Sequence, residues 1–212
     1  MHIPDDTAQE QDQENVMPAV LVRSIGGYEG SPPHHPQRLL DAGLRAVGYT
    51  VEALELPENT APDCETCLAF LQQQCRGLDN GILLLHSLAS RVFMLLVEQR
   101  RRCGQLTAPL VDTAVLLAPA NGRYIADWVP AVAAFFTPDV WTPVLTGAAR
   151  RLLIATSDND PYWEEAVTDL EVFRQQAGVE VLMLPGQGHL NQGEVSGNLP
   201  AVWAWILAAK PC

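Results

Sequence analysis

Three residues of this 212-residue chain, Ser87, Asp160 and His189, have side chains that together could perform nucleophilic catalysis. In such a triad the histidine takes the proton from the serine hydroxyl. The carboxylate holds the histidine in the correct tautomer and stabilises its cation. The sequence therefore predicts acyl transfer through Ser87, if the fold brings the three side chains together.

Ser87 stands where the sequence pattern changes abruptly. Residues 80–86 contain an apolar run without alternation, typical of a central parallel strand, and residues 88–102 have helical spacing. A serine in such a turn lies beside the outward-pointing N–H groups of a helix. The motif for this turn, G-x-S-x-G, has small residues where this chain has Leu85 and Ala89. The alternative is that Ser87 only caps the helix.

The acid and the base follow two later strands. Asp160 comes after the strand expected at residues 151–156, and His189 after the strand expected at residues 179–184. Asp160 also fits the N-cap of the next helix, a role that is compatible with catalysis. Asp158 is the alternative acid and ranks second because it lies nearer the strand end.

Acyl transfer also requires N–H donors for the oxyanion that forms. We expect the backbone N–H of Leu88, at the head of the helix, and that of Tyr28, in the glycine-rich first loop, to supply them. The other histidines, among them His34, His35 and His86, are interpreted as ordinary structural or loop residues.

Strand and helix patterns alternate along the chain, which predicts an α/β fold: a doubly wound, mostly parallel six-stranded sheet with helices on both faces. In such a sheet ligands bind at the carboxyl ends of the strands. The remaining expected strands are residues 19–22, 49–56 and 113–118, and the helices are residues 36–48, 64–75, 162–177 and 199–209. Residues 1–16 are expected to be a flexible acidic tail and residues 17–212 a single domain.

Residues 119–149 have no clear period and contain several aromatic residues among prolines. Two interpretations are open: a small cap over a pocket, with an apolar acyl site that includes Phe135 and Phe136, or aromatics that complete the core, which is favoured for any single one of them. The aromatic residues of this segment include Trp128, Phe135, Phe136 and Trp141.

The net charge of −12 disfavours nucleic acid and anionic membranes as partners, since both would repel the chain. No apolar run is long enough to span a membrane, and the N-terminus has no signal-peptide pattern, so a cytoplasmic location is expected. The five cysteines are expected to be reduced. Cys64 and Cys67 form a lone C-x-x-C without a second pair or a nearby histidine, so no metal site is predicted.

On these residues the chain resembles the small serine-hydrolase family of α/β-hydrolases that includes retinoblastoma-binding protein 9 and its compact bacterial relatives. The order serine, acid, histidine is that of α/β-hydrolases. Four stretches carry the resemblance: residues 26–37 (GGYEGSPPHHPQ), 85–89 (LHSLA), 157–162 (SDNDPY) and 188–191 (GHLN). The chain departs from the family pattern at Pro36, where a tryptophan is usual, at Ala89, and at Gly26, where some relatives have histidine.

The resemblance implies that Ser87, Asp160 and His189 form the triad. It also implies hydrolysis of small ester or acyl substrates without a cofactor. The first alternative is a catalytically impaired α/β-hydrolase-like binding protein, suggested by Leu85. The second is a nucleotide-binding protein that uses Glu55, but the first loop lacks the G-x-G-x-x-G spacing.

Overall fold

The computed structural model describes residues 20–137, 142–191 and 199–208, and these form a six-stranded sheet in the order β2-β1-β3-β4-β5-β6. Every pair of neighbouring strands is parallel, which confirms the predicted doubly wound sheet. The strands are β1 (Leu21–Gly26), β2 (Thr50–Glu55), β3 (Ile82–His86), β4 (Val111–Leu117), β5 (Ala149–Thr156) and β6 (Val179–Met183).

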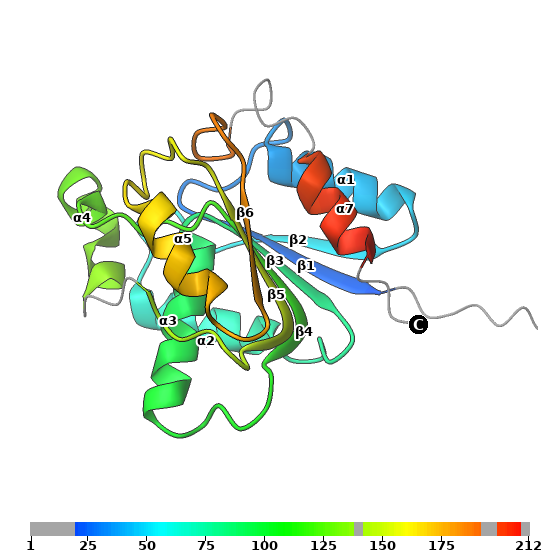
Figure 1. Cartoon of the computed structure of the whole chain (residues 1–212), viewed down its shortest axis with the longest axis horizontal. Coiled ribbons are helices and arrows are strands. Elements are labelled where there is room, and N and C mark those ends of the chain that lie inside the picture. Colours follow the sequence, from blue (N-terminus) through cyan, green and yellow to red (C-terminus); the bar gives the residue numbers. More distant parts are fainter. Residues whose placement is uncertain (1–19, 138–141, 192–198, 209–212) are drawn as a thin grey trace, which may run out of the picture.

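Helices cover both faces of the sheet (Figure 1). One core cluster packs α1 (Pro36–Ala46) and α7 (Pro200–Ala208) against the sheet, and the other packs α2 (Cys64–Gln74), α3 (Leu88–Arg102) and α5 (Ala166–Arg174). Successive side chains of the central strands enter opposite clusters, which explains why β3 and β4 are apolar without alternation.

The strand ends are aligned by the register of the sheet. His86 at the end of β3 is opposite Leu117 of β4, and Leu117 is opposite Ala155 near the end of β5. Because all strands run the same way, the loops that follow β1, β3, β5 and β6 meet at one edge of the sheet. This edge is where the three predicted triad residues are placed.

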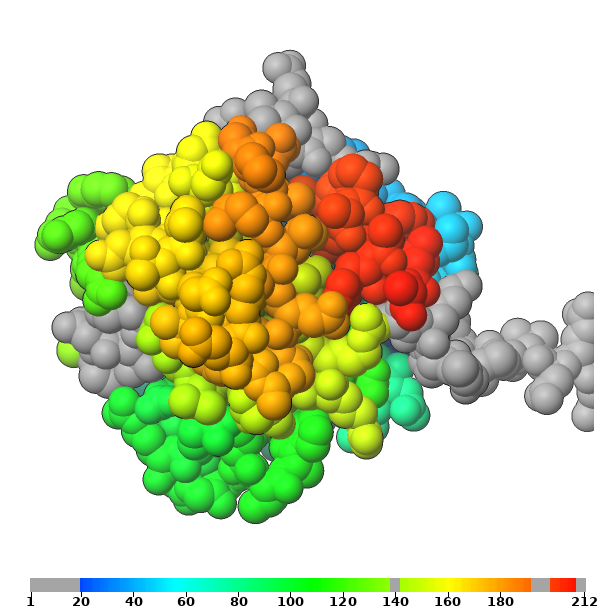
Figure 2. Space-filling view, viewed as in Figure 1, coloured from blue at the N-terminus to red at the C-terminus, as the bar shows by residue number. Residues whose placement is uncertain are grey.

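A short helix α4 (Ile125–Trp128) and a 3-10 helix η1 (Pro130–Phe136) follow β4 and lie beside this edge. In the space-filling view, the green segment that includes α4 projects from the body of the molecule (Figure 2). The two short helices form part of the segment predicted as a cap.

Two expectations from the sequence are wrong in detail. The fifth helix begins at Ala166 and not at Tyr162, because buried Trp163 and the turns around it occupy the preceding residues. The apolar spacing of residues 36–48 predicts an inward face of Leu39, Leu40, Leu44 and Val47. In α1 that face is partly polar instead: Gln37 and Asp41 are buried, whereas Leu39 and Val47 are exposed. Val47 lies beyond the last helical residue and Leu39 points away from the buried face.

The predicted tail at residues 1–16, Trp141 and Cys212 lie outside the described residues. The four cysteines that are described have free thiols. None of the helices in the described part of the chain combines the length and hydropathy that a membrane crossing requires.

Candidate active site

Ser87 occupies a sharp turn between β3 and α3. Its backbone has φ 55° and ψ −120°, which is a strained conformation for a residue other than glycine. Although Ser87 occupies the N-cap position of α3, its side chain makes no capping hydrogen bond there. Its Oγ lies 2.7 Å from Nε2 of His189 instead. The capping alternative therefore does not account for this side chain.

Neighbouring backbone holds the turn in this conformation. The N–H of Ser87 donates to the carbonyl of Leu117 in β4 (2.9 Å), and the hydroxyl of Ser90 donates to the carbonyl of Leu85 (3.0 Å). Leu85 is fully buried in the core between β1 and β4, so its bulk is accommodated away from the turn. Gly27 packs so closely that a Cβ atom there would lie 2.9 Å from the backbone nitrogen of Leu88.

The structure brings Asp160 and His189 together with Ser87. Nδ1 of His189 lies 2.9 and 3.0 Å from the two carboxylate oxygens of Asp160. The carboxylate also accepts hydrogen bonds from the N–H of Tyr162 (2.9 Å) and the hydroxyl of Thr156 (3.3 Å). Because a carboxylate only accepts, Nδ1 of His189 carries the hydrogen, which leaves Nε2 as an acceptor for the hydroxyl of Ser87. The geometry is that of a serine–histidine–acid triad.

Asp158 has a different task from Asp160. Its carboxylate accepts from the N–H of Gly186 (2.8 Å) in the loop that carries His189, and no contact with the His189 ring is recorded among the described residues. Asp160 is not the N-cap of α5, since Glu165 occupies that position. It caps only the tight turn at Tyr162.

The two predicted oxyanion donors lie at the pocket, near Ser87. Leu88 is the first residue of α3, where backbone N–H groups have no acceptor within the helix. Tyr28 is in the loop after β1, and both residues line the pocket beside Ser87. Within the described part of the chain, neither N–H donates a hydrogen bond. That these two N–H groups stabilise an oxyanion stays a prediction, as do the catalytic roles of the triad residues.

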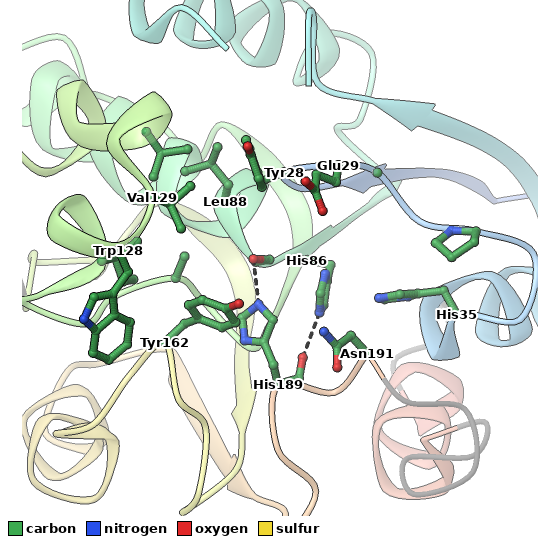
Figure 3. Close-up of a pocket in the computed structure, with 16 residues that line it drawn as sticks. Tyr28, Glu29, His35, His86, Leu88, Trp128, Val129, Tyr162, His189 and Asn191 are labelled. Carbon is green, nitrogen blue, oxygen red and sulfur yellow. Dashed lines mark hydrogen bonds between the residues drawn. The ribbon is translucent and has the colours of Figure 1, made fainter. Parts of the chain in front are cut away.

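A pocket of about 630 Å³ opens around Ser87 and has two chemically different walls. We call Glu29, His35, His86 and Asn191 the polar wall. Figure 3 shows these four on one side of His189, and Trp128 and Val129 on the other. The apolar wall comes from the two short helices and consists of Ile125, Trp128, Val129 and Val132.

The cap segment contributes to the pocket through residues other than the two predicted phenylalanines. Phe135 and Phe136 are buried in the core and are not among the residues that line the pocket. Trp128 does line it, with 58% of its surface exposed. Phe135 and Phe136 instead pack near buried Arg91 of α3, which donates to the Phe135 carbonyl and lies 5.0 Å from the Phe136 ring centroid.

The two histidines of the polar wall are neutral. Burial, followed by the charge of Arg38, lowers the pKa of His35 to about 4. Burial, followed by the nearby His189, lowers the pKa of His86 well below its usual range. The sequence alone predicts an ordinary role for both histidines, yet both line the pocket. The position of His86 immediately before Ser87 was the one available signal.

The residues considered for a metal or a nucleotide have other contacts in the described part of the chain. Among the described residues no cluster of histidine, cysteine or acidic side chains could hold a metal ion. Cys64 and Cys67 lie in α2, where burial raises the pKa of both thiols. Glu55, the acid of the nucleotide-binding hypothesis, pairs with Arg38 and accepts from the N–H of Ser31.

Comparisons with known proteins identify a family and a fold. A family model described as "Serine hydrolase" matches residues 21–208. No curated protein sequence matches the chain.

Solved structures are similar over most of the chain. The ydeN gene product from B. subtilis has a TM-score of 0.69 at 19% identity, covering 90% of this chain and 98% of that one. Est1E from Butyrivibrio proteoclasticus, bound to ferulic acid, has a TM-score of 0.64 at 15% identity, covering 90% and 89%. MGS-MChE2, an α/β-hydrolase from a sediment metagenome of the Mar Chica lagoon, Morocco, has 0.63 at 15%, covering 90% and 91%. At these sequence identities the structural similarity shows the fold alone.

Proposed function

Because this chain belongs to the serine hydrolase family, we propose that it is an esterase that hydrolyses small esters through an acyl-enzyme on Ser87. The observation that carries the proposal is the continuous hydrogen-bonded line from Ser87 through His189 to Asp160. All three residues follow the carboxyl ends of strands, where this fold binds its ligands.

The first half-reaction would begin with the hydroxyl of Ser87. Oγ attacks the ester carbonyl carbon while its proton passes to Nε2 of His189. Asp160 keeps the His189 ring oriented and stabilises its positive charge. The carbonyl oxygen becomes an oxyanion, for which the N–H groups of Leu88 and Tyr28 are the proposed donors.

The first half-reaction ends when the tetrahedral intermediate collapses, the bond to the alcohol oxygen breaks, and the alcohol leaves with the proton from His189, which leaves the acyl group on Ser87. The second half-reaction restores the enzyme. A water molecule then gives a proton to Nε2 of His189 and attacks the acyl carbon. The bond between the acyl carbon and Ser87 Oγ then breaks, the acid is released, and Ser87 Oγ takes back a proton from Nε2 of His189. These steps require only the residues of this chain and water.

The apolar wall supports an apolar or aromatic group on one side of the ester bond. Trp128 offers a flat exposed ring, and Tyr162 lies against His189 with ring centroids 4.5 Å apart. The similar structure of Est1E holds ferulic acid, an aromatic acid, which is consistent with this proposal. A cytoplasmic location is also proposed, with the free thiols of the described cysteines as support.

The test is covalent labelling of the intact protein by a fluorophosphonate probe, read by mass at Ser87. The wild type should be labelled, and Ser87→Ala and His189→Ala should both abolish labelling while remaining folded. A folded wild type that resists the probe and hydrolyses no ester would reject the esterase and favour a binding protein with the same fold.

A further inference from the structure

The loop that carries His189 is held from two sides. On one side, three successive N–H groups donate to three successive side chains of the loop after β5. These bonds join Gly186 to Asp158, Gln187 to Ser157 and Gly188 to Asn159, at 2.8, 2.9 and 2.8 Å. On the other side, the carbonyl of His189 lies 3.0 Å from Nε2 of His86, which is 103 residues earlier in the chain.

The chemistry of this last contact defines the state of His86. A carbonyl can only accept, so Nε2 of His86 must carry the hydrogen that it donates. The side chain is 4% exposed, and burial holds its pKa well below the usual range, so the ring remains neutral with the hydrogen on Nε2. The His189 carbonyl thereby receives a directed hydrogen bond within a buried environment.

The His86 ring is fixed from behind as well. The ring of His35 meets it edge-on, with centroids 4.5 Å apart. Nδ1 of His35 in turn accepts from the N–H of Gln37 at the start of α1 (3.2 Å). Figure 3 shows His86 between His35 and His189, with the dashed hydrogen bond from His86 to the main chain of His189.

We propose that His86 is a positioning residue that sets the distance between the nucleophile and its base. His86 is covalently adjacent to Ser87, and its Nε2–H holds the main chain of His189. One peptide bond, the buried His86 side chain and one hydrogen bond therefore connect the attacking serine to the backbone of the base. With Asp160 orienting the ring at Nδ1, the position of His189 Nε2 is defined at 2.7 Å from Ser87 Oγ. The inference rests on the proposed function of the triad.

The closing experiment uses three replacements of His86. Glutamine places an N–H donor near the position of Nε2, asparagine carries the same amide one bond short, and leucine fills the space without a donor. Each variant is assayed for kcat and KM on one neutral ester, for the rate of fluorophosphonate labelling, and for its free energy of unfolding.

We expect His86→Leu and His86→Asn to lower kcat by roughly 10- to 100-fold with little change in KM, as displacement of a reacting group does. His86→Gln should restore most of kcat. Leucine should be at least as stable as glutamine, because burying an amide is costly. Activity would then follow the donor position and not the stability.

Equal kcat in the leucine and glutamine variants would overturn the proposal, as would activity that simply follows stability. If the leucine variant fails to fold, the proposal is tested by comparing the glutamine and asparagine variants. Equal kcat in those two variants would reject the proposal. These results differ from failure of the proposed function, in which the wild type itself would neither label nor hydrolyse esters.

Discussion

The polar wall and the apolar wall meet at His189, and each is built by a different kind of interaction. In the polar wall, His35 accepts a hydrogen bond from the N–H of Gln37, the His35 ring meets the His86 ring edge-on, and His86 donates to the carbonyl of His189. In the apolar wall, Trp128 and its neighbours on α4 and η1 contribute apolar surface.

This difference indicates which property each wall controls. Hydrogen bonds depend on distance and angle, so a change in the polar wall moves the reacting atoms and alters the rate. Apolar contacts depend on area, so a change in the apolar wall alters which substrates bind. The predictions below test this division.

The largest effect on kcat should come from Asp160, which orients His189 at the point where the two walls meet. Asp160→Asn should lower kcat by about 10³- to 10⁴-fold, because the amide no longer favours the Nδ1–H tautomer of His189. The matched control is Asp158→Asn, whose amide oxygen can still accept from the N–H of Gly186. That variant should stay within a few fold of the wild type; an equal loss in the two variants would mean that the loop, and not the acid, is responsible.

Two substitutions should distinguish the role of the apolar wall in substrate preference from the role of the adjacent core in stability. Trp128→Ala should lower kcat/KM for long-chain or aromatic acyl esters by about tenfold relative to acetate esters, since it removes exposed apolar surface from the pocket. Phe136→Ala should cost roughly 3 kcal/mol of unfolding free energy by leaving a cavity, with the acyl preference unchanged. An acyl profile that shifts with Phe136 and not with Trp128 would contradict this assignment of the wall.

The polar wall should make the protein sensitive to acid. The pKa of His35 is lowered to about 4 in the folded chain, so between pH 6.5 and 4 the unfolded chain binds more protons. Stability should fall as pH decreases through that window, by up to about 1.4 kcal/mol per pH unit for one such group.

The measurement is the free energy of unfolding at pH 7, 6, 5 and 4.5. His35→Asn keeps a side chain suited to the N-cap of α1 and removes the titrating ring, so its stability should fall less steeply than that of the wild type. Trp128→Ala, in the apolar wall, should retain the slope of the wild type. Identical slopes for the wild type and His35→Asn would show that this ring does not cause the loss.

The smallest effect concerns charge at the rim of the polar wall. Glu29 is exposed and is the sole acidic side chain among the described residues that line the pocket. A choline ester should therefore be preferred over the uncharged 3,3-dimethylbutyl ester of the same acid. Glu29→Gln should reduce that preference by about two- to fivefold at low salt, the size typical of exposed charge pairs. Glu180→Gln, an exposed change on β6, should leave the preference unaltered.

Most of the fold could be predicted from local pattern. Apolar runs without alternation indicated buried parallel strands, and charge and capping residues indicated where helices begin and end. The strand ends then placed Ser87, Asp160 and His189 at one edge. Residues 162–165 were predicted less well, because a turn around buried Trp163 replaces the first turn of the expected helix. The burial of a side chain depends on distant neighbours that local pattern does not reveal.

For the candidate site, the residue types and their order along the chain were enough to propose the three triad residues and to rank Asp160 above Asp158. The structure adds the direction of the two carboxylates: Asp160 contacts the His189 ring, whereas Asp158 accepts from the N–H of Gly186. From the sequence alone His86 is interpreted as an ordinary residue. Its partner, the carbonyl of His189, is 103 residues away. The chemical type of each candidate residue can be read from the sequence. The distances between residues that are far apart in the chain are determined only by the tertiary structure, in which parallel strands bring their carboxyl ends together.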